Sequence, residues 1–272
     1  MSVNTVIVEK KYKKLVIQIA LDGFSYCIFD TLNHRIDFVN SVDFADYPKT
    51  NNTEEHYCKA FLDHQELTRI YDEVLVIHQN SWNTFVPQAL FESDFLGNYL
   101  QFNSQVFETD FFMFDTILNY EMNNVYVPFT VINNYLLDQF DHFDYKHSNS
   151  VLVEKLIDFS INNDEIQVFV HFEVQKFQIV IVQNQKLLLF NNFDFQTKED
   201  FIYYLLFTAE QMNLNPEHFK LQFLGDISPD GDLFDIAFKY VRHVSMFDVS
   251  EMSKNNGFST VENLKHFILF QA

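Results

Sequence analysis

An acidic residue stands beside a glycine and close to a serine early in the chain, at Asp22, Gly23 and Ser25. Glycine accepts positive φ angles, so consecutive backbone N–H groups can converge on an anion, and a carboxylate supplies an oxygen ligand for Mg²⁺. These residue types in this order therefore predict a loop that holds phosphate and a metal ion. The alternative is structural, because Asp-Gly is also the commonest sequence of a tight hairpin turn.

Histidine and aspartate gather most densely in one polar stretch, at Asp141, His142, Asp144 and His147. Their spacing does not supply the ligand geometry of a metal site, so we interpret them as solvated loop residues and expect no bound metal. The sequence also lacks the spacing of a Walker loop, of an H-E-x-x-H zinc site and of a G-x-S-x-G hydrolase.

Three consecutive antiparallel strands in residues 15–44 would position the first of these motifs. Apolar residues alternate along this stretch, and turn-forming residues break it at Asp22-Gly23 and at Asn33-His34. The pattern returns in residues 166–195 with one constant shift of 151 residues (168 − 17). Alternation alone is common to any two meanders of this kind. The identical residues at matched positions, which indicate a duplication, are Asn40 with Asn191, Asp43 with Asp194, and Phe44 with Phe195.

The same elements follow each set of three strands. In the first half, Thr53 is the predicted N-cap of a helix that runs to about Ile70, and residues 73–78 form a buried strand. In the second half, Thr197 precedes a helix that runs to Met212, and residues 220–224 form the strand. The other predicted elements are helices at 131–140, 151–161 and 233–241, strands at 125–129, 243–247 and 267–270, and a polar connection at 141–150.

A turn-forming run at residues 162–164 (Asn-Asn-Asp) separates the two halves. It predicts a first half at residues 1–162, with an insert at about 81–161, and a second half at 163–272. Because no low-complexity linker lies between them, we expect the halves to share an interface.

Two copies of strand-strand-strand-helix-strand resemble the actin-like ATPase fold, the ribonuclease H-like architecture of sugar kinases, heat-shock chaperones and actin. The resemblance implies an α/β protein with mixed sheets in two similar halves. At the level of residues, the chain is similar to a bacterial family, domain of unknown function 3822 (DUF3822). The segments that carry this similarity are 15–29, 86–87, 91–103, 125–128, 132–134 with Leu137, 145–147, and 224–225 with Ser228 and Leu233.

In ATPases of this fold, an Asp-x-Gly-Ser/Thr type loop of the first hairpin holds phosphate, and the resemblance places that role on Asp22, Gly23 and Ser25 with altered spacing. A second phosphate loop would lie at residues 173–176, where glycine is missing and a β-branched valine resists φ > 0. The adenosine-side turn falls at Gly225. The neighbouring acids repel phosphate, and the alternative is that Asp226 or Ser228 caps a helix.

The charge of the chain limits its partners. A net charge of −20, from 18 Lys+Arg and 38 Asp+Glu, disfavours nucleic acid and anionic lipid surfaces. No apolar stretch reaches about eighteen residues, and the first residues lack a signal-peptide pattern, so we expect a cytoplasmic protein without a membrane span. Two widely separated cysteines, Cys27 and Cys58, fit reduced thiols.

Two functions follow. The first is a protein without catalytic activity and without a cofactor, which binds a protein partner as a scaffold module. The alternative is a nucleotide-binding protein or ATPase that holds ATP with Mg²⁺ in a cleft between the halves, using Asp22, Gly23, Ser25 and Gly225. An acidic mimic of nucleic acid ranks last, because the acids are dispersed along the sequence. Neither the partner nor the oligomeric state is specified.

Overall fold

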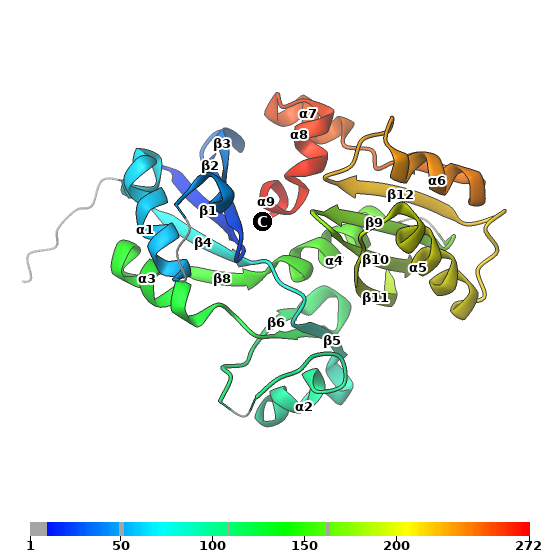
Figure 1. Cartoon of the computed structure of the whole chain (residues 1–272). Coiled ribbons are helices and arrows are strands. Elements are labelled where there is room, and N and C mark those ends of the chain that lie inside the picture. Colours follow the sequence, from blue (N-terminus) through cyan, green and yellow to red (C-terminus); the bar gives the residue numbers. More distant parts are fainter. Residues whose placement is uncertain (1–9, 49–51, 108, 162–163) are drawn as a thin grey trace, which may run out of the picture. The chain divides into compact units, whose positions relative to one another are not determined.

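The computed structural model describes residues 10–48, 52–107, 109–161 and 164–272 (Figure 1). Its chain divides into two compact units. The described residues of unit 1 fall in Met1–Gln79 and Pro128–Lys146, and those of unit 2 in Asn80–Val127 and His147–Ala272. The predicted boundary at 162–164 lies partly outside the described residues, and the division at 162/163 stays a prediction.

Unit 1 is built on a five-stranded sheet of order β3-β2-β1-β4-β8. The strands are β1 Lys13–Ile19, β2 Gly23–Asp30, β3 Arg35–Asp43, β4 Glu73–His78 and β8 Asp144–His147. The first three form the predicted antiparallel meander, and β4 runs parallel to β1. Helices α1 Thr53–Asp63 and α3 Thr130–Phe140 pack on one face of this sheet around a core of aliphatic and aromatic side chains.

Three predictions for unit 1 are corrected. The N-cap of α1 is Asn52, whose side chain accepts the N–H of Glu54, and not Thr53. This helix ends at Asp63, and a separate 3-10 turn, η2 Gln65–Thr68, continues the chain. The polar connection expected at 141–150 contains strand β8, which the sequence did not predict because charged residues occupy its exposed positions.

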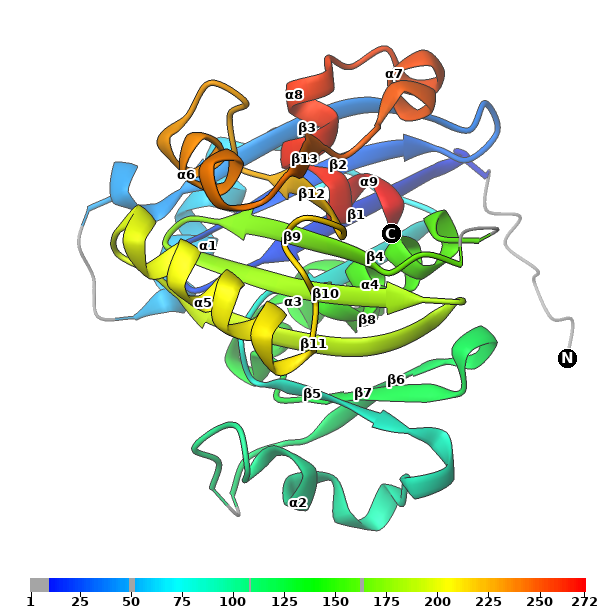
Figure 2. The ribbon, with the colours of Figure 1, turned by 90° about the vertical axis from the view of Figure 1, so that its right-hand side faces the viewer.

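Unit 2 contains a second five-stranded sheet with the equivalent order, β11-β10-β9-β12-β13. Its strands are β9 Gln167–Glu173, β10 Lys176–Gln183, β11 Lys186–Asp194, β12 Lys220–Gly225 and β13 His243–Met246. Helices α5 Lys198–Gln211 and α6 Asp232–Tyr240 pack on one face, as Figure 2 shows for α5. Strands β9 and β10 are buried on both faces, which is typical of a sheet covered from two sides.

The C-terminal apolar run of unit 2 is helical. Residues 267–270, expected as a strand, form helix α9 Phe267–Gln271, which packs against α4 Ser148–Phe159 through Phe159 and Phe267. Four successive apolar residues have no clear periodicity, so the sequence alone could not separate the two structures. Helices α7 Ser250–Asn256 and α8 Thr260–Lys265 precede it. Along the described parts of the chain, every helix is too short or too polar to cross a bilayer.

Unit 2 also holds a small antiparallel sheet of order β5-β7-β6, formed by β5 Asn83–Pro87, β6 Met113–Ile117 and β7 Met122–Tyr126. Helix α2 Leu96–Leu100 packs against it over a small core that includes Val86 and Val125. The remaining 3-10 helices are η1 Phe44–Asp46, η3 Gln88–Leu90, η4 Ser93–Phe95 and η5 Leu118–Tyr120.

The two five-stranded sheets match in detail. Each has a bulge at the same place, between Ile28 and Phe29 in β2 and between Ile181 and Val182 in β10. In the β2–β3 and β10–β11 pairings, Gly23 and Lys176 hold equivalent positions, a shift of 153 residues (176 − 23), whereas β3 and β11 match with a shift of 151 (194 − 43). The constant shift of 151 was therefore wrong by two residues for the first two strands, because the turn before β11 is two residues shorter.

Candidate functional site

The first predicted phosphate loop is the connection between β1 and β2 in unit 1. Leu21 and Asp22 form its tip, because the Ala20 N–H donates to the Gly23 carbonyl at 2.9 Å. Gly23 itself is buried in β2 and does not adopt a positive φ. A Cβ at this position would lie 2.3 Å from the Val42 carbonyl oxygen, so glycine allows a close approach between strands.

Ser25 and the loop backbone already have partners within unit 1. The Ser25 hydroxyl lies 2.8 Å from the Ser41 hydroxyl on the neighbouring strand. The buried Tyr57 hydroxyl of α1 donates to the Ala20 carbonyl at 2.8 Å and fixes the base of the loop. Asp22, at the tip of the loop, is exposed to solvent. This arrangement presents a single carboxylate to solvent from a rigid hairpin.

Gly225, the fourth predicted site residue, ends β12 in unit 2. Its φ is +90°, and a Cβ would lie 2.2 Å from the Phe172 carbonyl oxygen. The next residue, Asp226, donates its N–H to the same oxygen at 2.9 Å. The N-cap of α6 is Gly231, so neither Asp226 nor Ser228 caps that helix. Asp22, Gly23 and Ser25 belong to unit 1 and Gly225 to unit 2, and their joint role in nucleotide binding stays a prediction.

The hairpin where a second phosphate loop was sought is a tight turn. Glu173 and Lys176 pair across it, and only Val174 and Gln175 lie between them. Gln175 has a φ of +58° and therefore takes the left-handed position of this turn without a glycine. The Lys176 ammonium lies 3.5 Å from the Ser81 hydroxyl and 3.9 Å from the Asp194 carboxylate.

The structure places the two predicted solvated histidines differently. His142 is exposed, but His147 is fully buried, and its Nδ1 accepts the Asn149 N–H at 3.1 Å as the N-cap of α4. The interpretation of His147 as a solvated loop residue was wrong, because β8 runs directly into this helix. Within the residues that the structure describes, no three His, Cys, Asp or Glu side chains group as metal ligands would.

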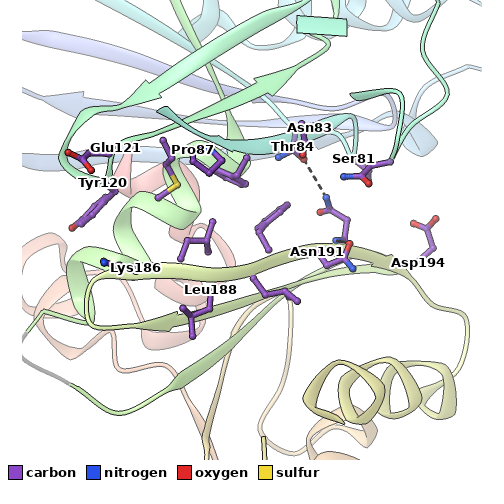
Figure 3. A pocket seen from close by; sticks show the side chains of 17 residues that line it. Ser81, Asn83, Thr84, Pro87, Tyr120, Glu121, Lys186, Leu188, Asn191 and Asp194 are labelled. Carbon is purple, nitrogen blue, oxygen red and sulfur yellow. Dashed lines mark hydrogen bonds between the residues drawn. The ribbon is translucent and has the colours of Figure 1, made fainter. Parts of the chain in front are cut away.

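A cavity of about 640 Å³, which the sequence did not indicate, lies within unit 2 between β5 and β11 (Figure 3). Both strands are edges of their sheets. Its volume falls in the range of ligand sites. The lining residues are Ser81, Asn83, Thr84, Phe85, Pro87, Asn103, Tyr120, Glu121, Met122, the run 186–192, and Asp194.

A buried amide network closes one end of this cavity. Asn83, only 4% exposed, donates to the Asn124 side chain at 2.9 Å and accepts from Asn149 of α4 at 3.0 Å. It also accepts from Asn192 of β11 at 3.4 Å. Asn124 in turn donates to the Ser150 hydroxyl at 2.9 Å. Hydrogen bonds between side chains therefore fix the positions of β5, β7, α4 and β11 around the cavity.

The other end of the cavity carries a tyrosine. The Tyr120 hydroxyl donates to the Asp158 carboxylate of α4, and burial together with this acid raises the pKa of the phenol above its usual value. Tyr120 therefore stays neutral at physiological pH. Glu121 beside it has a φ of +49°, which turns the chain sharply from η5 into β7.

The family whose description is "Protein of unknown function (DUF3822)" matches residues 3–244. The chain belongs to this family. The match covers the first five-stranded sheet, the small sheet between β4 and α3 in the sequence, and the second five-stranded sheet up to the first two residues of β13. It confirms the family predicted from the sequence.

Solved structures with the same fold support this placement. A Bacteroides thetaiotaomicron protein with actin-like ATPase fold and unknown function is 21% identical over 97% of both chains, with a TM-score of 0.81. A chain of the PilM-PilN type IV pilus biogenesis complex is 11% identical over 94% of this chain and 96% of that chain, with a TM-score of 0.59. These matches confirm the predicted duplicated actin-like ATPase fold.

The cytoplasmic domain of EpsL, an inner membrane component of the type II secretion system of Vibrio cholerae, is also similar. It is 11% identical over 96% of this chain and 95% of that chain, with a TM-score of 0.50. No curated protein matches the chain.

Proposed function

We propose that this DUF3822 protein does not catalyse phosphoryl transfer and acts by binding a partner protein. The β9–β10 turn carries the proposal, because its two tip residues, Val174 and Gln175, leave no glycine-lined loop for phosphate. Phosphoryl transfer depends on positioned backbone amides and a bound metal. The loss of one of two phosphate loops would remove most of that catalysis.

The similar structures support the binding part of the proposal. Two of them, at TM-scores of 0.59 and 0.50, come from a PilM-PilN complex and from a component of a secretion system. The first description names a complex of two proteins, and the second names a component of a larger secretion system. The large cavity within unit 2 offers a surface for such a contact.

The catalytic part is tested by Mg²⁺-dependent ATP turnover of the purified chain. We expect no turnover above background. Turnover that Asp22→Ala abolishes and Asp46→Ala retains would overturn the proposal. Asp46 is a matched control, because it is an exposed aspartate of the same unit on η1.

The binding part is tested by affinity capture from the native host, followed by reconstitution of the captured protein with the purified chain. We expect a stoichiometric complex of two purified proteins. If none of the captured proteins binds the purified chain after its own purification, the result counts against a protein partner.

Nucleotide binding without catalysis is the second candidate, and the positive φ of Gly225 at the end of β12 favours it. Saturation of such a site raises stability by about 2.7 kcal/mol at a hundredfold excess of ligand over its dissociation constant. A rise in Tm with ATP and Mg²⁺ that Ser25→Ala removes and Ser41→Ala retains would support this function. Each substitution breaks the hydrogen bond between the Ser25 and Ser41 hydroxyls, but only Ser25→Ala removes a residue predicted to contact the nucleotide. An unchanged Tm would exclude it.

A further inference from the structure

The outer edge of β5 faces the cavity with unpaired backbone groups. Residues on this strand alternate between those that bond β7 and those that face outward. The Val127 N–H donates to the Trp82 carbonyl at 3.1 Å, and the Gln88 N–H donates to the Glu121 carbonyl at 2.7 Å. Even-numbered positions of β5 therefore bond to β7. Asn83, Phe85 and Pro87 direct their backbone groups outward, and a proline without an N–H suits such an edge.

The outer edge of β11 follows the same logic. The Phe195 N–H donates to the Gln175 carbonyl at 3.0 Å, and Phe193 and Asn191 are paired with β10 in the same register. Odd-numbered positions at this end of β11 therefore bond to β10. Phe190, Asn192 and Asp194 direct their backbone groups toward the cavity. The Asn192 N–H is covered by the Asn191 side-chain oxygen at 3.1 Å.

The two edges face each other without forming a ladder. Their facing side chains meet, because the rings of Phe85 and Phe190 lie 4.9 Å apart and the Asn192 amide reaches Asn83 at 3.4 Å. Across the described residues, no backbone hydrogen bond joins β5 to β11, and the two strands belong to different sheets. Two rows of backbone donors and acceptors thus border the cavity, which is the feature that strand addition exploits.

A ligand with a hydrogen-bond donor would suit the polar end of the cavity. Among the described residues, no donor reaches the buried side-chain oxygen of Asn192, which lines the cavity. A buried acceptor left without a donor costs free energy, so a ligand that supplies an N–H to Asn192 would gain binding energy. The carboxylate of Asp194, 82% exposed, lies at the same end, 3.9 Å from the Lys176 ammonium and accessible to a second cation, and the chain as a whole carries a net charge of −20. A cationic or N–H-rich group suits this end, and an acidic group does not.

We infer that the cavity binds an extended segment of a partner protein, which adds a strand to the β11 edge. The segment carries apolar side chains at alternate positions, which contact Phe85, Phe190 and Leu188, and a Lys or Arg near Asp194. The segment spans about five residues, because β5, which borders the cavity opposite β11, is five residues long. This inference rests on the proposed function as a protein-binding module, for which it names the site and the chemistry of the partner.

The probe for this site is a displayed library of random ten-residue peptides, selected on the intact chain and counter-selected on Leu188→Lys. Leu188 lines the cavity and is 41% exposed, so the substitution adds a repelling charge without opening the core. Val174→Lys is the matched control, because Val174 is an exposed apolar residue of unit 2 outside the cavity lining.

We expect enriched peptides to alternate apolar residues and to contain Lys or Arg. Synthetic versions, measured by fluorescence anisotropy, should bind Leu188→Lys at least about tenfold more weakly than the unaltered chain, and Val174→Lys equally well. N-methylation of alternate peptide residues should abolish binding in one register and spare it in the other, because an added strand bonds through every second residue.

Three results would overturn the inference: no enrichment, enrichment of acidic peptides, or equal affinity for Leu188→Lys. A small molecule that raises the Tm of the unaltered chain but not of Leu188→Lys, without peptide enrichment, would assign the cavity to a small ligand instead. A reconstituted protein partner that binds Leu188→Lys as tightly as the unaltered chain would refute this site and leave the proposed function standing.

Discussion

The two five-stranded sheets use one hydrogen-bonding plan but place glycine at different points. The N–H of Phe44 donates to the Asp22 carbonyl at 2.9 Å, and in unit 2 the N–H of Phe195 donates to the Gln175 carbonyl at 3.0 Å. Asp22 is therefore equivalent to Gln175, and the glycine after it is equivalent to Lys176. A lysine with a Cβ fits where unit 1 requires glycine, because Gly23 lies close to the Val42 carbonyl of the neighbouring strand β3.

At the end of the fourth strand, unit 2 has a glycine and unit 1 has a histidine. His78 pairs with Ile19 in unit 1, and Gly225 pairs with Phe172 in unit 2. After each, the next N–H donates back to the same strand at 2.9 Å. His78 has a negative φ, whereas Gly225 is left-handed at +90°. Two sheets with the same strand order therefore end their fourth strands with different residue types. Unit 2 has glycine at this point because the backbone there takes a positive φ.

Gly225→Ala should produce the largest effect, because it combines a left-handed φ with a Cβ only 2.2 Å from the Phe172 carbonyl oxygen. We expect a loss of about 3–5 kcal/mol in the free energy of unfolding, measured with urea. Gly257→Ala is the matched control, since its φ is +76° but no atom lies within 4 Å. Its loss should be about 1–2 kcal/mol, from φ alone. Equal losses would mean that the close approach to Phe172 has no energetic weight.

Gly23→Ala should be the next largest, at about 2–3 kcal/mol, because its Cβ would lie 2.3 Å from the Val42 carbonyl oxygen and force β2 and β3 apart. Lys176→Ala, at the equivalent place in unit 2, should change the free energy of unfolding by no more than about 0.5 kcal/mol. The comparison fails if the two alanine variants unfold at the same urea concentration.

His78→Gln should weaken the acid sensitivity of the fold. Burial lowers the pKa of His78 to about 3, below the ordinary 6.5. The unfolded chain therefore binds the proton first, and stability present above pH 6.5 is lost as pH falls toward 3, by about 1.4 kcal/mol per pH unit. Part of that slope should vanish in His78→Gln. Some should remain, since burial also lowers the pKa of His171.

Urea unfolding at pH 7.5 and pH 5 measures this slope. His142→Gln serves as the control because its ring is exposed, and it should retain the slope of the unaltered chain. A His78→Gln protein with an unchanged slope would show that the buried ring of unit 1 is not the acid-sensitive group.

Asn40→Ala and Asn191→Ala should have the smallest effects, about 0.5–1 kcal/mol each in the free energy of unfolding. Both side chains accept the backbone N–H of the following residue on an edge strand, at 2.9 Å from Ser41 and at 3.1 Å from Asn192. Asn→Asp at either position keeps the accepting oxygen and should be milder. A loss at only one of the two positions would separate the repeats at this point.

The matches of Asn40 with Asn191 and of Phe44 with Phe195 gain a physical reason from these bonds. The sequence indicated that these residues recur. In the structure, Asn40 and Asn191 each accept the N–H of the next residue on an edge strand. Phe44 and Phe195, which directly follow β3 and β11, each donate an N–H to a carbonyl of the first hairpin turn of their sheet. The two-residue difference between the repeats was not visible, because apolar alternation has a period of two and a slip of two preserves it.

By itself, the sequence determined the meanders, the helix after each and the fourth strand, because periods of 2 and 3.6 are local properties of the chain. The cavity between β5 and β11 was decided only by tertiary structure. Its polar end depends on Asn83, which bonds residues 41, 66 and 109 positions away in the sequence. No local pattern specifies which two sheet edges face each other, since that choice depends on how the sheets and α4 pack together.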